Sequence, residues 1–300
     1  MPEEEERTAY KPRKELFSAD RQVCILLMSS HDSQMESQLV SIITVVFNGE
    51  AHLQEAIDSV RAQSYSPIEY IIIDGGSSDK TLEIINSNSD IISRWVSEPD
   101  NGIYDAMNKG IRMASGTYIG LLNADDLLMP DAVQRVVEGL EALCEPGYTC
   151  GAVELVDQAG RRRGTRTPLP QELRFKRRFI EMPCPHLGVF VHRSVYQRVG
   201  VFDTQLKLSA DYDFVLRLLG ANVPVICILE PLGKFRSGGA SGGLATWLES
   251  YQVLKKHGIS RPVATYIFFR SLLRANVARL LSPTFKRLSR KFMVSKNSYE

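Results

Sequence analysis

The stretch Val40-Ser-Ile-Ile-Thr-Val-Val-Phe-Asn-Gly49 decides the fold of this 300-residue chain. Its first eight residues are β-branched or apolar almost throughout, which is typical of a strand buried on both faces of a parallel sheet. Asn48-Gly49 ends the strand. Residues 51–63 then predict a helix, because apolar side chains recur at helical spacing: Leu53, Ala56, Ile57 and Val60.

The same alternation of strand and helix continues to residue 123. We expect strands at 68–73, 91–96 and 118–122, and helices at 81–86 and 103–114. This order implies parallel strands joined by right-handed crossovers. The predicted fold class is α/β, a doubly wound, mixed but mainly parallel sheet with a Rossmann-like nucleotide-binding half. Ligands of such sheets bind beyond the carboxyl ends of the strands.

The second half of the chain has a less regular pattern. A Gly/Ser-rich segment, Ser237–Gly243, is interpreted as a flexible linker or as a loop that closes over a ligand. The expected elements before it are a helix from Pro130 to about 143, a loop with a short helix across the arginine-rich run 161–178, a strand at 186–192, a helix at 211–219 and a strand at 223–229.

Composition limits the classes of protein to consider. Hydrophobic residues make up 44% and the formal net charge is +1, as in an ordinary globular protein. No nucleic-acid recognition motif accompanies the basic stretches, so nucleic acid is not an expected partner. The five cysteines are odd in number and form no CxxC pair, which predicts neither a disulfide framework nor a zinc site. No signal peptide or 18-residue apolar run is present. We therefore expect a cytoplasmic protein, at most peripheral on the inner face of the plasma membrane.

The predicted domain organisation has three parts. Residues 1–38 are charged and without a clear period, as in a flexible extension. Residues 39–245 hold the predicted α/β domain. Residues 246–300 form a basic helical tail.

The strongest signal for chemistry is Asn123-Ala-Asp125-Asp126, at the end of an apolar strand. Adjacent carboxylates repel each other, and a divalent cation removes that repulsion. Hard oxygen ligands suit Mn²⁺ or Mg²⁺ shared with phosphate groups. The alternative is a solvated Asp-Asp turn that caps the next helix.

Two further polar clusters follow strands. In Asp74-Gly-Gly-Ser-Ser-Asp79 the glycines permit close approach of a ligand, and Asp74 could accept hydrogen bonds from a base or ribose. The alternative is an ordinary turn with Asp79 as a helix N-cap. In the segment Ser97–Gly110, Asp100 precedes a glycine turn and Lys109 could neutralise a phosphate, unless it is a solvated surface lysine.

The order of these segments resembles family-2 glycosyltransferases of the GT-A fold. Residues 40–48 resemble the family's first strand, and 73–81 resemble its uridine-binding turn, with Gly75 in place of the second Asp. Asn123-Ala-Asp125 is similar to the DXD motif, with Asn in the first position. The wider pattern, which covers about two thirds of the chain, resembles the exopolysaccharide subgroup typified by colanic-acid glycosyltransferases.

The segment Gly200-Val-Phe-Asp203 followed by Ala210-Asp-Tyr-Asp213 resembles the part of the family that carries the catalytic base. The resemblance assigns that role to Asp211, with Asp213 as the local alternative. It implies transfer of a sugar, with inversion, from a nucleotide sugar to a hydroxyl of a glycan or lipid-linked acceptor in polysaccharide biosynthesis. UDP is the default nucleotide and GDP the alternative.

The resemblance also implies a set of site residues. Asp125 and Asp126 would hold the metal, and His186 and Asp213 would contact the acceptor or diphosphate, although His186 is equally well explained as a structural histidine. The donor nucleotide would contact Thr44, Phe47, Asn48, Asp74, Gly75, Ser77, Asp79, Asp100, Tyr104, Asn108, Lys109, Asn123 and Ala124.

Two other functions compete with sugar transfer. A sugar nucleotidyltransferase would carry a Gly-rich phosphate loop with Arg and Lys after its first strand, and residues 47–52 lack it. A GT-A-like module that binds nucleotide or glycan without turnover is compatible with Asn123 and Gly75. The presence of Asp125 and Asp211 argues against that module.

The tail is basic and amphipathic. Residues 255–296 contain eleven Lys or Arg and no acidic residue. Apolar side chains recur there at helical spacing: Tyr266, Phe269, Leu273, Val277 and Leu280. We expect this helix to contact an anionic membrane, and the alternative is a helix that packs its apolar stripe on the catalytic domain.

Overall fold

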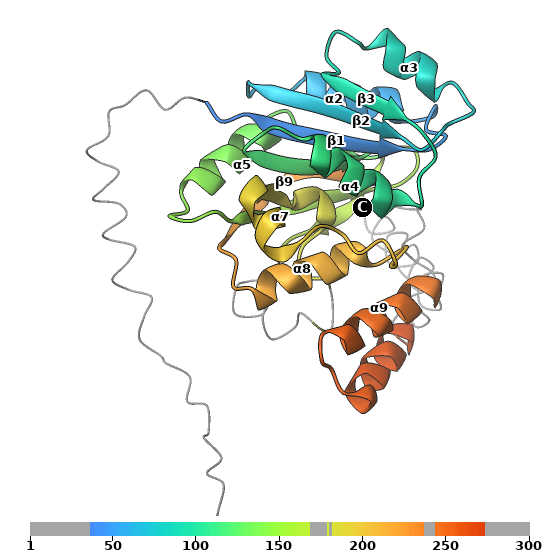
Figure 1. Cartoon of the computed structure of the whole chain (residues 1–300), viewed down its shortest axis with the longest axis vertical. Coiled ribbons are helices and arrows are strands. Elements are labelled where there is room, and N and C mark those ends of the chain that lie inside the picture. Colours follow the sequence, from blue (N-terminus) through green and yellow to red (C-terminus); the bar gives the residue numbers. More distant parts are fainter. Residues whose placement is uncertain (1–36, 169–178, 180–181, 237–243, 274–300) are drawn as a thin grey trace, which may run out of the picture. The chain divides into compact units, whose positions relative to one another are not determined.

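The computed structural model describes residues 37–168, 179, 182–236 and 244–273, and its centre is a mixed nine-stranded sheet (Figure 1). Four parallel strands, in the order β3-β2-β1-β4, form its first half. Their bounds are β1 (Val40–Val46), β2 (Ile68–Asp74), β3 (Arg94–Ser97) and β4 (Tyr118–Asn123). Because these strands are in parallel register, their carboxyl ends lie at one edge of the sheet.

The second half of the sheet is mixed. From β4 the order continues β8-β6-β9-β5, with β7 paired to β6. Strand β8 runs antiparallel to both of its neighbours, β4 and β6, whereas β6 and β9 are parallel. The bounds are β5 (Leu127–Leu128), β6 (Tyr148–Val156), β7 (Arg162–Arg166), β8 (Phe190–His192) and β9 (Val225–Arg236). The predicted mixed, mainly parallel α/β fold is confirmed.

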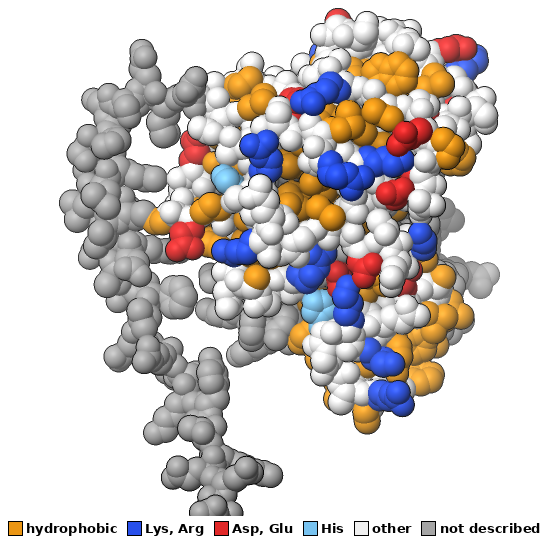
Figure 2. All heavy atoms as spheres, viewed as in Figure 1, with side chains coloured by type: hydrophobic (Ala, Val, Ile, Leu, Met, Phe, Trp, Pro, Cys, Tyr) orange, Lys and Arg blue, Asp and Glu red, His pale blue; other side chains and the backbone are white. Residues whose placement is uncertain are grey.

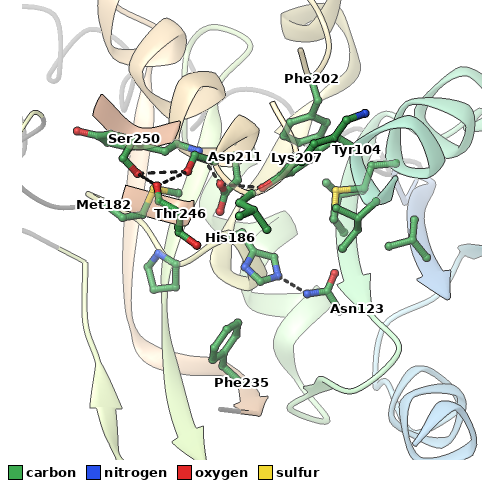
Figure 3. A pocket seen from close by; sticks show the side chains of 18 of the residues that line it. Tyr104, Asn123, Met182, His186, Phe202, Lys207, Asp211, Phe235, Thr246 and Ser250 are labelled. Atoms are coloured by element: carbon green, nitrogen blue, oxygen red, sulfur yellow. Dashed lines mark hydrogen bonds between the residues drawn. The ribbon is translucent and has the colours of Figure 1, made fainter. Parts of the chain in front are cut away.

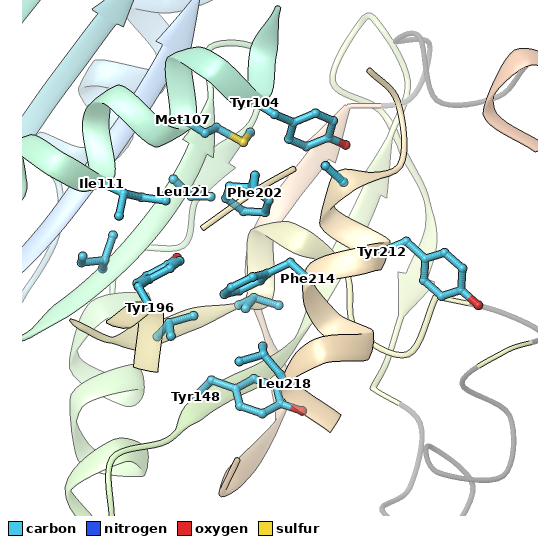
Figure 4. Packing of buried hydrophobic residues seen from close by; sticks show 14 of the residues in the cluster. Tyr104, Met107, Ile111, Leu121, Tyr148, Tyr196, Phe202, Tyr212, Phe214 and Leu218 are labelled. Atoms are coloured by element: carbon cyan, nitrogen blue, oxygen red, sulfur yellow. The ribbon is translucent and has the colours of Figure 1, made fainter. Parts of the chain in front are cut away.

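Helices cover both faces of the sheet and enclose two hydrophobic cores. Neighbouring residues of β1 belong to different cores, because side chains alternate along a strand: Ile42 lies in one and Ile43 in the other. The Ile42 core includes α2 (Leu53–Arg61), α3 (Thr81–Ser87) and α5 (Ala132–Glu141). The Ile43 core includes α4 (Ile103–Met113), α7 (Arg193–Val199) and α8 (Ala210–Gly220) (Figure 4).

Several elements of the second half differ from the sequence prediction. Strand β6 and helix α7 were not predicted, Arg162–Arg166 is a strand rather than loop and helix, and β9 extends to Arg236. The third strand begins only at Arg94, and residues 186–188 form a 3-10 turn before β8. Strand β6 escapes the pattern because Gly151 interrupts its apolar run. Leu232 of β9 packs over that glycine, so the tertiary contact explains what the sequence obscures.

A disulfide joins Cys150 of β6 to Cys184, with the two Cα atoms 5.4 Å apart. The expectation that no disulfide would form is therefore wrong. The two cysteines are 34 residues apart, and only the folding of the chain brings them together. The bridge ties β6 to the turn that carries His186.

The C-terminal helices continue the same compact unit as the sheet, which begins at Gln38. They are α9 (Leu244–Lys256) and a helical segment at residues 261–273. No helix among the described residues is long and apolar enough to cross a membrane. The predictions for residues 1–36, for the glycine-rich segment 237–243 and for the tail beyond 273 lie outside the described residues, as do Arg174–Arg178.

A buried carboxylate fastens the end of α9 to α8. Asp213 is fully buried and accepts hydrogen bonds from Arg217 Nε at 2.9 Å, His257 Nε2 at 3.0 Å and Lys256 Nζ, 3.1 Å away. Burial alone would raise the pKa of Asp213. The hydrogen bonds from His257 and Arg217 outweigh it and hold that pKa well below its usual range.

We expect Asp213→Asn to lower the free energy of unfolding at pH 7 by about 3 kcal/mol, because it removes the buried charge with which Arg217 and Lys256 pair. A carboxylate with a lowered pKa stabilises the fold above its unfolded pKa of about 3.9, and this contribution disappears as the pH falls below that value. The difference in unfolding free energy between wild type and variant, measured by urea unfolding, should therefore be smaller at pH 3 than at pH 7. Asp203→Asn, which removes a partly exposed partner of Lys256, is the control. Equal losses of unfolding free energy in the two variants would contradict this role of Asp213.

Candidate active site

A pocket of about 730 Å³ opens beyond the carboxyl ends of β1 and β4 and is closed by α8 and α9 (Figure 3). Its lining joins residues that are far apart in the sequence. The residues expected from sequence that line it are Phe47, Asn48, Tyr104, Asn123, Ala124, Asp125, His186 and Asp211. Those that do not line it are Thr44, Asp74, Gly75, Ser77, Asp79, Asp100, Asn108, Lys109, Asp126 and Asp213.

Asn123 ends β4 at the edge of the pocket. Its Nδ2 donates to His186 Nε2 at 2.9 Å and to Asp126 Oδ2 at 3.3 Å. Its Oδ1 is buried without a hydrogen-bond partner. An oxygen in that state is available to a ligand in the pocket, as is the carboxylate of Asp125.

Asp126 is directed into the protein rather than into the pocket. It is 1% exposed, and its Oδ1 accepts the backbone N–H of Arg236 at 2.9 Å. Burial raises the pKa of Asp126 to about 8. The Arg236 side chain also donates to the carbonyl of Asp125 at 3.0 Å, so the end of β9 fixes the loop after β4. Asp126 thus has an internal partner where the sequence predicted a metal ligand.

His186 lies in the 3-10 turn after Pro185, with its ring edge-on to Phe235 at 5.5 Å between centroids. Burial lowers the pKa of His186, so the ring is neutral near pH 7. Because Asn123 donates to Nε2, the ring proton resides on Nδ1. His186 therefore combines a structural contact with a place in the pocket wall.

Asp211 occupies the first turn of α8 and faces the pocket. Its Oδ1 accepts the Tyr104 hydroxyl at 3.0 Å and its neighbour's backbone N–H at 2.8 Å. Burial and the adjacent Asp211 charge raise the pKa of Tyr104, so the phenol remains a hydrogen-bond donor. Asp213 lies about 200° further round the helix and is turned away, into the ion-pair network with α9.

The turn after β2 is held together by its own hydrogen bonds. Asp74 is fully buried and accepts from Ser77 N at 3.0 Å and from Ser97 Oγ at 2.6 Å. A side chain at Gly75 would begin 2.6 Å from the Asp100 carboxylate. Asp100 therefore fills the space that the second Asp of the family motif would need. Asp79 accepts Thr81 N at 3.0 Å from one position before the N-cap residue of α3, which is Lys80.

Three other residues expected at the donor site also have partners within the fold. The hydroxyl of Thr44 accepts from Tyr70 at 3.0 Å, and both are buried. Asn108 exchanges two hydrogen bonds with the backbone of Phe202. Lys109 pairs with Glu98 at 2.9 Å. These residues support the walls of the pocket from outside it.

Glu249 of α9 is a site residue that sequence reasoning missed. Its carboxylate accepts the backbone N–H groups of Lys207, Leu208 and Ser209, at 2.7, 2.6 and 2.7 Å. These residues lead directly into α8, where Asp211 begins. The contact spans about 40 residues, and no local pattern announces it. A residue of the tail therefore positions the segment before Asp211.

We expect Glu249→Gln to disturb this segment, because the amide keeps the shape but replaces one acceptor oxygen with a donor. A buried N–H left without an acceptor costs about 1–3 kcal/mol of unfolding free energy. Each kcal/mol lost lowers the melting temperature by about 2–4 °C. Calorimetry measures the loss. Glu83→Gln, at an exposed position of α3, should leave the melting temperature unchanged. An unaltered melting temperature for Glu249→Gln would contradict the role.

The fold and the pocket define a GT-A glycosyltransferase. The structure of S. aureus TarS 1–349 with UDP-GlcNAc matches with a TM-score of 0.58 at 15% identity, over 72% of this chain and 64% of that chain. This chain thus spans less than two thirds of that structure. The mannosyltransferase PcManGT from Pyrobaculum calidifontis, in complex with GDP-Man and Mn²⁺, matches with a TM-score of 0.54 at 17% identity, over 90% and 89% of the two chains.

Sequence comparison then gives the family: the model of glycosyl transferase family 2 matches residues 41–200, and the chain belongs to that family. An uncharacterized glycosyltransferase of Mycobacterium tuberculosis is 36% identical over 197 residues, 63% of this chain and 73% of the relative. A PGL/p-HBAD biosynthesis glycosyltransferase of Mycobacterium bovis is 30% identical over 225 residues, 74% and 85% of the two chains. The predicted family and enzyme class are confirmed. The narrower resemblance to the exopolysaccharide subgroup stays a prediction.

Proposed function

We propose that this glycosyltransferase moves a sugar from a nucleoside diphosphate sugar to an acceptor hydroxyl by a single displacement with inversion. The observation that carries the proposal is the shared pocket of Asp125, at the end of β4, and Asp211, at the start of α8. One carboxylate is placed for the diphosphate end of a donor and the other for the acceptor.

The donor end of the pocket lies beyond β1 and β4, where Phe47, Asn48 and Asp125 line it. This is the expected nucleotide position in a doubly wound sheet. UDP is our first choice and GDP the alternative, since TarS binds UDP-GlcNAc and PcManGT binds GDP-Man. Arg166 and Arg236 also line the pocket and add positive charge for a diphosphate.

The residues at this end fit Mn²⁺ or Mg²⁺. The carboxylate of Asp125 and the unpartnered Oδ1 of Asn123 are hard oxygen donors. The described residues contain no cluster of three or more His, Cys, Asp or Glu suited to a metal, so the diphosphate and water would complete the coordination. When bound, the cation would neutralise the charge on the departing diphosphate.

Asp211 serves as the general base. An acceptor hydroxyl is too weak an acid to attack unaided, so the carboxylate takes its proton as the oxygen bonds to the anomeric carbon. The bond between that carbon and the diphosphate oxygen breaks, and the nucleoside diphosphate leaves. The Tyr104 hydroxyl fixes the carboxylate at Oδ1 and remains protonated.

Two conservative variants should separate binding from turnover. Asp125→Asn is expected to weaken the Mn²⁺-dependent part of UDP or GDP binding at least tenfold, because it removes a charged oxygen ligand. Asp211→Asn should leave nucleotide affinity unchanged and reduce transfer at least a hundredfold, since base catalysis contributes about 10²–10⁴. Isothermal titration with and without Mn²⁺ and release of nucleoside diphosphate measure the two properties.

The outcomes distinguish the competing functions. Undiminished turnover by Asp211→Asn would refute the assignment of the base. Failure of wild-type protein to bind either nucleotide in the presence of metal would favour the non-catalytic module.

We further propose that the acceptor is a glycan or lipid-linked glycan of the cell envelope, and that the tail holds the enzyme on an anionic membrane surface on the cytoplasmic side. Tyr266, Phe269 and Leu273 are 68%, 59% and 65% exposed, as a membrane-facing stripe requires. Figure 2 shows apolar side chains gathered over the C-terminal helices with Lys and Arg beside them. Buried apolar area and basic charge act together in such binding.

Cosedimentation with vesicles tests the membrane contact. Binding to phosphatidylglycerol-containing vesicles should exceed binding to pure phosphatidylcholine and weaken at 0.5 M salt, because screening removes the charge term. Phe269→Ala should weaken it about tenfold, as expected for the loss of a buried phenyl group. Phe268→Ala, at the next position but in the pocket wall, is the matched control. Equal binding to both vesicle types would contradict the contact.

A further inference from the structure

One wall of the pocket is built by the C-terminal helices and is apolar. Trp247, Tyr251 and Leu254 recur at spacings of four and three residues along α9 and so share one helical face. Ile267 and Phe268 of the next helix continue the surface, and Met182 borders it. The ring of Phe268 meets that of Tyr251 at 6.3 Å between centroids.

The hydroxyl of Ser250 on this wall is already engaged. Ser250 Oγ donates to the carbonyl of Thr246 at 2.8 Å and lies 3.2 Å from Ser209 Oγ. Among the described residues that line the pocket, no charged side chain comes from α9 or from residues 261–273. A hydrocarbon placed against the apolar side chains of this wall loses no hydrogen bonds to water.

The charged lining lies elsewhere in the pocket. Asp125, Arg166 and Arg236 come from the strands or the loops that follow them. In Figure 3, Asp211 has Thr246, Ser250 and Met182 on one side and Asn123 on the other. The proposed base therefore stands between the wall built by the C-terminal helices and the charged side chains at the strand ends.

We infer that this wall binds a hydrocarbon chain carried by the acceptor, so that the reacting hydroxyl belongs to a lipid-type glycoside. This inference rests on the proposed function and names the acceptor class for the same pocket. The wall from Trp247 to Leu254 extends about 10 Å along α9, longer than a single aromatic ring. The outer sides of the same helices are also apolar, with Leu248 and Phe269 exposed, so a chain can continue from the pocket to the surface.

A homologous series of detergents below their micelle concentrations tests this contact. The chain has two tryptophans, and Trp95 lies on β3 outside the pocket lining. In the variant Trp95→Phe, the emission therefore reports Trp247 alone. Hexyl, heptyl and octyl β-glucoside should shift this emission with dissociation constants that fall about fourfold for each added methylene. Glucose should cause no shift.

Neighbouring phenylalanines provide the matched variants. In the same background, Phe268→Ala should weaken octyl glucoside binding about tenfold, whereas Phe269→Ala should change it less than twofold because its ring is outside the pocket. If calorimetry shows that Phe268→Ala does not fold, Ile267→Ala takes its place. Affinities independent of chain length, or equal losses from the two phenylalanine variants, would overturn the inference.

Two controls separate this inference from its premises. If phenyl β-glucoside binds as tightly as octyl glucoside, the wall binds a compact aromatic group rather than a hydrocarbon chain. That result would also overturn the inference. Titration of the same samples with UDP and GDP tests the donor site independently. Nucleotide binding without a chain-length effect would reject the hydrocarbon site alone, whereas loss of both would reject the proposed function.

Discussion

The buried carboxylate of Asp213 is the interaction on which the closed pocket depends. Its side chain binds Arg217 of its own helix and also Lys256 and His257 at the end of α9, and these contacts hold α9 against α8. Once α9 is in place, Glu249 reaches the three N–H groups that precede α8. The tail therefore completes the domain structurally, and the Asp213 cluster and Glu249 together hold the α9 wall of the pocket in place.

Neighbouring carboxylates in this enzyme differ because their surroundings differ. Asp126 is buried with few donors and its pKa rises to about 8. Asp213 is also buried, but hydrogen bonds from His257, Arg217 and Lys256 lower its pKa. Asp125 and Asp211 remain in the pocket lining, where a cation and an acceptor can reach them. The sequence pairs Asp125 with Asp126 and Asp211 with Asp213, and in each pair the fold leaves one carboxylate in the pocket lining and bonds the other within the protein.

Sequence reasoning worked best where the signals were local. Strands β1, β2 and β4 are continuous apolar runs ended by polar turns, and each was expected within about one residue of its bounds. Local signals placed Asn123 and Asp125 at a strand end, and the family resemblance added Asp211, which lines the same pocket. Sequence reasoning missed β6 and the disulfide at Cys150, and it predicted a loop and a helix where Arg162–Arg166 forms a strand. These features depend on pairing partners that are distant in the chain.

The sequence by itself determined the α/β class and the polar ends of the strands, since strand burial, helical period and turn residues are properties of short segments. The order of its motifs also carried the resemblance to the family. Only the tertiary structure decided which of those polar residues share a pocket. Asp74, Asp100 and Asn108 became supports behind the walls, Glu249 came to hold the segment before Asp211, and the apolar face of α9 became part of the pocket lining. The physical reason is that burial and hydrogen-bond partners are set by contacts between segments tens of residues apart, which no local pattern encodes.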